Sequence, residues 1–225
     1  MSGLQERRGG AVTGPGRRER NKQEKRERIL AAASALFDER GYAAVTTQQV
    51  ADRADVAAGT LFRYAATKPE LLLMVTNARV AAALETGLRR ADGEGDPARA
   101  ALALVAPLLE QSRANAENTA CYQREVVYGA DGTYRTEALE LVDGFVTAIA
   151  ALLERAWTRS HPRTDAPDPS AAADAVFASL HAAILAAARP DLAADPLSDL
   201  LAAQVALIVR GYLTTPRPAR KGATT

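Results

Sequence analysis

Apolar residues recur at intervals of three and four along most of the chain, which is the period of an α-helix with one buried face. The first such stretch runs from about residue 21 or 23 to residue 39, and Gly41 supplies the expected stop. Its apolar positions are Ile29, Ala32, Ala33, Leu36 and Phe37. This spacing predicts a helix that packs one side against the rest of the protein.

Two short helices are predicted next. The run Thr46-Thr47-Gln48-Gln49 is typical of a capping box, in which Thr46 is the N-cap of a helix over residues 47–53. Residues 54–56 then form a three-residue turn, and a second short helix follows over residues 57–65. Two short helices joined by such a turn, with a supporting helix before them, predict a helix-turn-helix over residues 46–64.

The rest of the chain alternates helical stretches with turn sequences. We expect helices from residue 67 to about 90, from 97 through a kink at Pro107, from 115 to 128 and from 134 to 159. A Pro-rich loop over residues 161–169 precedes two last helices, over about 170–188 and 196–213. Alanine is abundant and aromatic residues make up only 5% of the chain, so we expect an all-α protein.

This pattern divides the 225 residues into four segments. Residues 1–20, rich in Gly and Arg, form a disordered basic arm, and residues 216–225 a disordered tail. Residues 21–75 form a three-helix, helix-turn-helix DNA-binding domain, and residues 76–215 a larger helical domain. We expect the larger domain to bind an effector and to form a dimer.

Charge is distributed unevenly along the chain. Residues 1–28 hold nine Lys or Arg against four Glu, a net charge of +5, whereas the whole chain carries only +1. A basic arm on a slightly acidic body is expected if one end of the protein meets phosphate. Solubilising charge and insertion into the minor groove are the other interpretations of this arm.

Composition indicates a protein of the cytoplasm with no membrane partner. The sequence begins without the apolar segment of a secretory signal, and we expect no membrane-spanning run. The single cysteine, Cys121, allows no internal disulfide and is interpreted as a small core residue rather than a redox sensor. Neither His161 nor His181 has metal-ligand spacing, so we expect no metal and no cofactor.

The second helix of a helix-turn-helix enters the major groove of DNA. Ala58, Gly59, Arg63 and Tyr64 are predicted to face outward, while Phe62 leans partly toward the core with its neighbour at 61. Thr46 is interpreted as a cap rather than a DNA contact, and Arg63 as a DNA contact rather than a solvated charge. Lys68, at the start of the next helix, can pair with phosphate.

These residues resemble the TetR family of repressors. The matching positions, all within residues 24–75, are the run 28–33, Leu36-Phe37, Gly41-Tyr42, Thr46, Val50-Ala51, the run 54–56, Gly59-Thr60-Leu61-Phe62, Tyr64, Lys68 and Leu71-Leu72. The resemblance implies a homodimer that binds double-stranded, palindromic operator DNA as a repressor and is released by a small-molecule effector. The DNA-binding residues that we infer from the motif and the resemblance are Thr47, Gln48, Ala58, Gly59, Thr60, Arg63, Tyr64 and Lys68.

The chain departs from the family pattern at four positions. Asp55 replaces the usual Gly of the turn, and Asp tolerates a left-handed backbone better than most residues. Ala57 replaces the usual Ser, which removes a helix cap at a cost of about 1 kcal/mol. Phe62 lacks the hydroxyl of the usual Tyr, so we exclude it from the contacts. Ala65 replaces an aromatic residue and thins the core of the small domain.

The last two helices are predicted to form the dimer interface. The final helix is apolar on more than one face, so both of its sides must be buried, and the second side is assigned to a partner subunit. An effector pocket for a small apolar or aromatic compound is expected among the helices of residues 96–185. Its candidate lining residues, each of which can instead be ordinary core, are Tyr122, Tyr128, Phe145, Trp157, Phe177 and His181.

Two other functions stay open at this point. One is a DNA-binding regulator without a small-molecule effector, which acts as an activator or answers to a protein partner. The other is a helical enzyme, although the chain carries none of the common nucleophile, metallopeptidase or nucleotide-binding motifs and we expect no catalytic residues.

Overall fold

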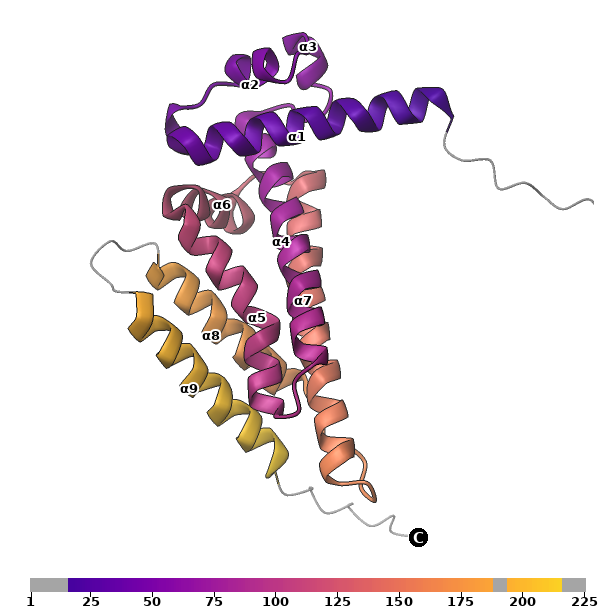
Figure 1. Ribbon diagram of the computed structural model, residues 1–225, viewed down its shortest axis with the longest axis vertical. Helices are drawn as coiled ribbons and strands as arrows, with labels where there is room; N and C mark the ends of the chain where they lie inside the picture. Colours follow the sequence, from indigo (N-terminus) through magenta and orange to yellow (C-terminus); the bar gives the residue numbers. More distant parts are fainter. Residues whose placement is uncertain (1–15, 188–193, 216–225) are drawn as a thin grey trace, which may run out of the picture.

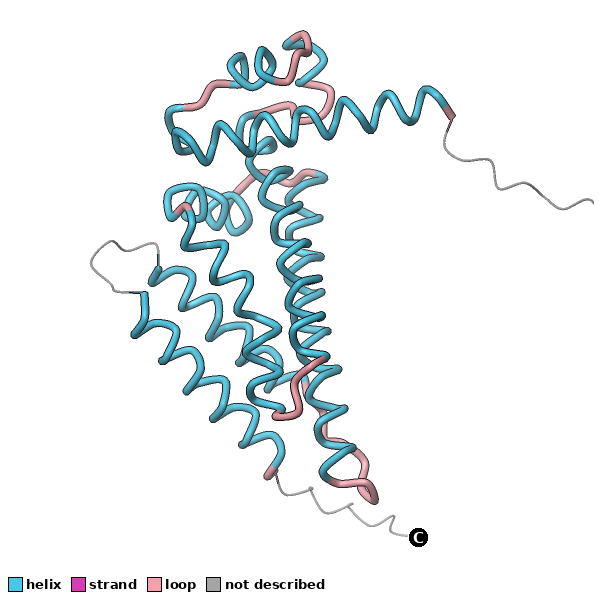
Figure 2. The backbone as a smooth tube through the Cα atoms, viewed as in Figure 1, coloured by secondary structure: helices cyan, strands magenta, loops and turns pink. Residues whose placement is uncertain are grey.

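The all-α prediction is confirmed by the computed structural model, which describes residues 16–187 and 194–215 and whose regular elements there are nine helices without a strand (Figure 1). Three helices form a small N-terminal layer: α1 (Arg17–Ala44), α2 (Thr47–Arg53) and α3 (Ala58–Leu61). The larger bundle contains α4 (Lys68–Asp92), α5 (Pro97–Ala114), α6 (Ala116–Tyr128), α7 (Thr133–Ser160), α8 (Ser170–Ala187) and α9 (Ala194–Leu213). Figure 2 shows that short loops join most of these helices.

Helix α1 lies across the top of the bundle and begins earlier than the sequence suggested (Figure 1). It starts at Arg17, so the expectation that the disordered arm extends to residue 20 is wrong for residues 17–20. Arg, Glu, Lys and Gln dominate this stretch, and all four are good helix formers. The rest of the predicted arm, residues 1–15, and the predicted tail, residues 216–225, lie outside the described residues.

Gly41 interrupts α1 where the sequence predicted its end. Its φ of 75° lies in the left-handed region that favours glycine, and the chain makes one further helical turn to Ala44. The five predicted apolar positions of α1 are all buried. Helix α1 therefore presents one apolar face to the remainder of the small domain, as its spacing predicted.

Helix α4 joins the small layer to the bundle. Its first turns bury Leu71 and Leu72 in the same continuous apolar core that reaches Ile29 in α1, and its later turns bury Val80 and Ala83 among the bundle helices. The domain boundary expected near residue 75 thus falls inside one unbroken helix. A displacement of α4 would move both parts of the protein.

Two helices, α4 and α8, are apolar and long enough to span a membrane by length and composition alone, contrary to the expectation from the sequence. Half of the most apolar window of α4 is buried in the bundle, so burial explains its composition. In α8 only 28% of that window is buried. Helix α8 therefore keeps a largely apolar face that the protomer does not cover.

The tightest packing in the bundle lies between α4 and α5, at Gly87. A Cβ atom built on Gly87 would overlap the backbone carbonyl of Leu104 in α5. A backbone carbonyl in a packed helix cannot rotate away as the end of a side chain can, so only glycine permits this crossing.

We expect Gly87→Ala to destabilise the protein by about 1–3 kcal/mol, because the added methyl group would overpack the α4–α5 crossing. At an open helical position the same change would stabilise by up to about 1 kcal/mol, since alanine has the higher helix propensity. Gly144→Ala is the matched control, because its Cβ would meet only a terminal methyl of Leu84, at 3.3 Å. Urea unfolding of the three proteins measures the difference, and a Gly87→Ala variant as stable as the control would contradict the packing argument.

Candidate nucleic-acid interface and ligand cavity

The first helix of the predicted helix-turn-helix is confirmed in both bounds and capping. Thr46 is the N-cap of α2, and its Oγ1 accepts a hydrogen bond from the backbone N–H of Gln49 at 3.2 Å. In return, the backbone N–H of Thr46 donates to Oε1 of Gln49 at 2.9 Å. This reciprocal box satisfies two otherwise unpaired donors at the helix start. Val50 and Ala51 are the buried residues of α2.

The turn after α2 contains the one non-glycine residue with a positive φ among the described residues, Asp55, at 52°. Asp55 replaces the glycine that is usual in the family that the motif resembles. The short Asp side chain tolerates this left-handed conformation, as expected. The backbone N–H of Val56 donates to the carbonyl of Ala51 at 3.0 Å and closes the turn. Asp55 also pairs with Arg28 of α1, with 3.2 Å between Oδ2 and Nη1, at the protein surface.

The second helix of the motif is shorter than predicted. Helix α3 covers only four residues, whereas the sequence indicated a helix over residues 57–65, and Figure 2 shows the loop that follows it. Ala57 supplies no side-chain cap, and the segment contains Gly59 and Thr60, which are weak helix formers. Beyond Leu61 the chain continues in tight turns, in which the N–H of Tyr64 donates to the carbonyl of Leu61 at 2.8 Å.

The outer surface of the motif presents the predicted DNA-binding residues unevenly. Gln48, Gly59 and Arg63 are exposed, while Thr47, Ala58, Thr60, Tyr64 and Lys68 are half-buried. Phe62 was expected to lean toward the core, but it is 46% exposed and lies on the same outer surface. The interior position next to it is filled by Leu61, which is fully buried.

Two of these residues also hold the small domain together. The hydroxyl of Tyr64 donates to the backbone carbonyl of Lys22 in α1 at 3.1 Å. The ammonium group of Lys68 donates to the carbonyl of Ala43 at 3.2 Å and lies 4.3 Å from the centre of the Tyr42 ring. An ammonium has three N–H bonds, so Lys68 can still reach a phosphate from this position.

A basic groove beside Arg63 was missed as a site in the sequence. Arg18, Lys22 and Lys25 of α1 line it together with Arg63 and Tyr64. Their spacing of four and three residues puts the three cations on one face of a helix, which is the signal that would have identified them. Helix α1 therefore brings the positive charge of the N-terminal segment directly next to α3.

The C-terminal end of α1 is held by the N-terminal end of α6. The carbonyl of Phe37 accepts hydrogen bonds from the side-chain amides of Asn115 and Asn118, at 3.0 and 2.9 Å. Just beyond the break at Gly41, the N–H of Ala43 donates to the carboxylate of Glu117 at 2.8 Å. These bonds fix the small domain to the helix that forms one wall of a cavity in the bundle.

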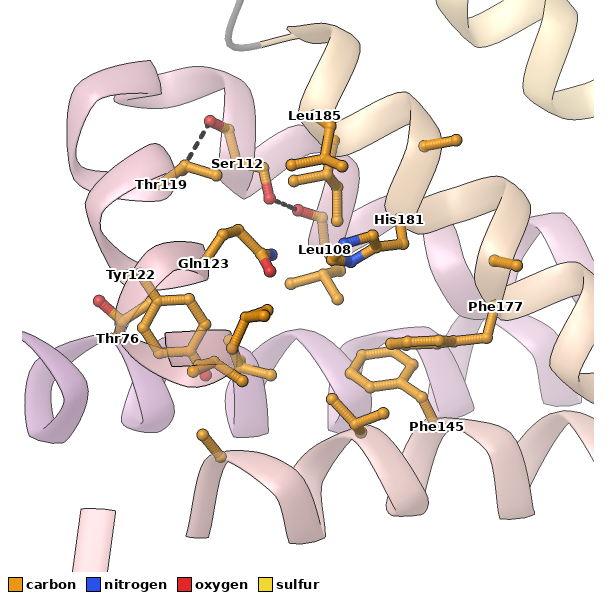
Figure 3. Close-up of a pocket in the computed structure, with 18 of the residues that line it drawn as sticks. Thr76, Leu108, Ser112, Thr119, Tyr122, Gln123, Phe145, Phe177, His181 and Leu185 are labelled. Atoms are coloured by element: carbon orange, nitrogen blue, oxygen red, sulfur yellow. Dashed lines mark hydrogen bonds between the residues drawn. The ribbon is translucent and has the colours of Figure 1, made fainter. Parts of the chain in front are cut away.

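The cavity has a volume of about 500 Å³ and lies among α4, α5, α6, α7 and α8 (Figure 3). Four of the six residues predicted to line a pocket border it: Tyr122, Phe145, Phe177 and His181. The other two do not. Tyr128, at the last turn of α6, is 83% exposed. Trp157 is buried elsewhere, stacked on His161 with 4.0 Å between ring centroids and edge-on to Tyr212 of α9.

A chain of hydrogen bonds runs from the cavity wall to the turn that follows α3. The hydroxyl of Tyr122 donates to Oδ1 of Asn77 at 2.9 Å, and the amide of this buried Asn77 donates to the backbone carbonyl of Tyr134 at 2.8 Å. The hydroxyl of Tyr134 in turn donates to the backbone carbonyl of Tyr64 at 2.7 Å. Burial raises the pKa of both tyrosine hydroxyls, so they stay protonated and keep donating at neutral pH.

Cys121 lies near this wall but carries no sign of a reactive thiol. Burial raises the pKa of the Cys121 thiol, which keeps it in the less nucleophilic protonated form. Among the residues that the structure describes, no three His, Cys, Asp or Glu side chains are arranged to hold a metal ion.

A capped helix-turn-helix on a bundle with an internal cavity defines the class of helix-turn-helix regulators. Residues 29–75 match the family described as "Bacterial regulatory proteins, tetR family". Over this segment the chain is similar to the TetR family of regulators.

Longer parts of the chain are similar to known proteins. The HTH-type transcriptional repressor KstR of Mycobacterium tuberculosis is 33% identical over 151 residues, which are 64% of this chain and 63% of that protein. The chain thus covers slightly less than two thirds of the length of this relative. A transcriptional regulator from Rhodococcus sp. Rha1 superposes with a TM-score of 0.64 and 24% identity, over 85% of this chain and 99% of that one. Thermus thermophilus FadR, solved in complex with lauroyl-CoA, superposes with a TM-score of 0.62 and 24% identity, over 88% of this chain and 100% of that one.

We expect the hydrogen bonds around Asn77 to show as a free energy of coupling. Asn77→Leu should destabilise the protein by about 1–3 kcal/mol, because it leaves the hydroxyl of Tyr122 buried without a partner. Tyr122→Phe should then cost less in the Asn77→Leu background than in the wild type. A double-mutant cycle from denaturant unfolding measures the coupling, expected at about 0.5 kcal/mol or more. Strictly additive effects would show that Asn77 of α4 and Tyr122 of α6 are not coupled.

Proposed function

We propose that the protein is a transcriptional repressor that binds palindromic operator DNA as a homodimer and is released by a small-molecule effector. The observation that carries this proposal is the physical connection of an exposed helix-turn-helix to an apolar cavity through continuous hydrogen bonds. The role requires no catalysis, and it assigns the protein to the cytoplasm, where the operator lies.

For DNA binding, the proposal assigns base contacts to Arg63 and Gln48, the exposed long polar side chains of the motif. Gly59 has no atom within 4 Å of the position where a Cβ would stand, so α3 can approach the groove floor closely. Thr47, Ala58, Thr60, Tyr64 and Lys68 flank these positions and complete the proposed contact surface. Arg18, Lys22 and Lys25 would bind the phosphates beside the same groove.

The outer faces of α8 and α9 are the proposed dimer interface. The inner stripe of α9, which consists of Leu201, Val205, Val209 and Tyr212, is buried within the protomer. Its outer stripe leaves Leu200 54% and Leu207 64% exposed. A helix that is apolar on both sides is expected to be covered on both, and a second copy of this chain can cover the outer side of each protomer symmetrically.

For regulation, the two connections between cavity and small domain support a population shift. Helix α6 lines the cavity through Tyr122 and also holds α1 through its N-terminal residues. Tyr134 joins the same cavity wall to the backbone at Tyr64. A ligand that moves α6 would act at both points and alter the spacing of the two DNA-binding helices in a dimer. Half-sites one helical turn apart, roughly 34–36 Å, make operator affinity sensitive to that spacing.

We expect Arg63→Ala to weaken binding to the selected operator by about tenfold or more, because each base contact contributes roughly 1–3 kcal/mol. Binding to unrelated DNA should fall much less. The operator is first obtained by selection from random sequences, and affinities are measured at fixed salt concentration. Arg99→Ala is the control, since this exposed cation lies on α5 at the start of the bundle. Equal losses on both DNAs would show that Arg63 contacts only the backbone.

We expect Leu207→Glu to convert the dimer into a monomer, because it would bury two charges at the proposed interface. The side chain is 64% exposed in the protomer, so the helical circular dichroism should not change. Leu88→Glu, at an exposed position on α4, is the matched control and should remain a dimer. Sedimentation at micromolar concentration gives the result. A monomeric wild type, or a dimeric Leu207→Glu variant, would count against this interface.

A further inference from the structure

We propose that the cavity takes an uncharged, mostly hydrocarbon compound with a single hydroxyl or carbonyl head group. The inference rests on the proposed function only in treating the cavity as a ligand site. In Figure 3, Phe145 and Phe177 lie at one end of the cavity, and Gln123 and His181 point into its middle.

The apolar end fits the hydrocarbon body. Phe145 and Phe177 tilt against each other with 6.2 Å between ring centroids and 40° between ring planes. Val80 of α4 and Leu108 of α5 also line the cavity with aliphatic side chains. Hydrocarbon that binds to such a surface leaves water, which stabilises the complex. The surface offers no hydrogen-bond partner for a polar group.

Three hydroxyl groups near the cavity have already used their protons. Ser112 donates to the carbonyl of Leu108 at 2.7 Å, and Thr119 donates to the carbonyl of Ser112 at 3.0 Å. Tyr122 donates to Asn77, away from the cavity. These groups can therefore only accept a hydrogen bond from a ligand.

Gln123 and His181 are the polar groups that point into the middle of the cavity, and the polar side chains of Gln111 and Thr76 line it as well. Gln123 and His181 are half-buried, and neither forms a hydrogen bond with any residue that the structure describes. The amide of Gln123 both donates and accepts, and a neutral imidazole does the same. Together they can bind a carbonyl, which accepts, or a hydroxyl, which does both. One such head group would satisfy both side chains within an otherwise apolar cavity.

Charge on the cavity wall argues against an ionic ligand. The described residues that line the cavity include no Lys or Arg, and the one carboxylate among them, Asp174 of α8, is exposed at the rim. The imidazole of His181 is positive only when protonated, so beside a neutral His181 a carboxylate or phosphate would be buried without a positive partner, which is unfavourable. The proposed ligand therefore differs in charge from lauroyl-CoA, the anionic compound in complex with Thermus thermophilus FadR.

The test compares three ten-carbon probes that differ only in their head group, with the full-length protein and isothermal titration calorimetry. We expect decan-1-ol to bind at least about tenfold more tightly than decanoate or decyltrimethylammonium, because only the alcohol enters without burying a charge. Equal or tighter binding of either ion would overturn the inference. So would tighter binding of lauroyl-CoA than of decan-1-ol, or no binding of decan-1-ol.

Variants of Gln123 test the position of the head group. Gln123→Leu should weaken decan-1-ol binding by about fivefold to tenfold, the effect of losing one neutral hydrogen bond. Gln123→Arg should reverse the preference and favour decanoate over decan-1-ol. Ala120→Arg is the matched control, because it adds the same charge to α6 at an exposed position outside the cavity. If Gln123→Leu binds decan-1-ol like the wild type, or if both arginine variants gain decanoate affinity equally, the inference fails.

Because calorimetry measures binding alone, the inference and the proposed function can fail separately. Decan-1-ol that binds without weakening operator affinity would support the ligand chemistry and contradict effector release. A charged compound that releases the operator, from a protein that does not bind decan-1-ol, would support effector release and overturn the ligand chemistry.

Discussion

The position of the DNA-binding motif depends on one junction, where the end of α1 meets the start of α6. Helix ends expose backbone groups that need partners, and here side chains of α6 supply them. Asn115 and Asn118 both bind the carbonyl of Phe37, and Glu117 receives the N–H of Ala43. Gly41 makes this contact possible, because a Cβ at that position would overlap the carboxylate of Glu117. At this junction polar bonds of defined geometry attach the small domain to the bundle, in addition to the apolar core that α1 shares with α4.

Hydrogen bonds of this kind hold the small domain in one position but can also be broken together. An extensive apolar interface is non-directional and tolerates sliding, whereas a few hydrogen bonds define one position and are lost together when the geometry changes. Arg79 of α4 adds a similar bond, since its guanidinium pairs with Asp38 of α1. In the proposed mechanism, these bonds separate two discrete arrangements of α1 instead of a continuous range.

The sequence predicted the features that arise from neighbouring residues. The capping box at Thr46 and the left-handed Asp55 depend on contacts within a few positions, so residue type and spacing determine them. The contacts of Tyr64 with Lys22 and of Lys68 with Ala43 span 42 and 25 residues and depend on how α1 lies. The basic groove also depends on how α1 lies, because Arg18, Lys22 and Lys25 meet Arg63 and Tyr64 from a distant part of the chain.

The cavity was predicted only in part, because an apolar pattern does not reveal which neighbour a face meets. Phe145 and Phe177 lie on apolar faces directed at the cavity, and both were identified. Trp157 lies on the apolar face of the same α7 as Phe145, but twelve residues further on, where α9 covers it. Tyr128 follows the last well-packed turn of α6 and extends into solvent. Helix periodicity defines a face, but tertiary packing determines its partner at each turn.

Substitutions in α8 would affect the cavity and the proposed dimer interface together. Ala178, Ala182 and Leu185 border the cavity, and they also belong to the apolar face of α8 that the protomer leaves uncovered. In the proposed dimer the same side chains would limit the space for a ligand and the approach of the second copy. A larger residue at any of these positions would reduce the volume of the cavity and also reshape the proposed dimer interface. New ligand preferences are therefore more accessible through α5 and α6, whose cavity residues do not lie on this shared surface.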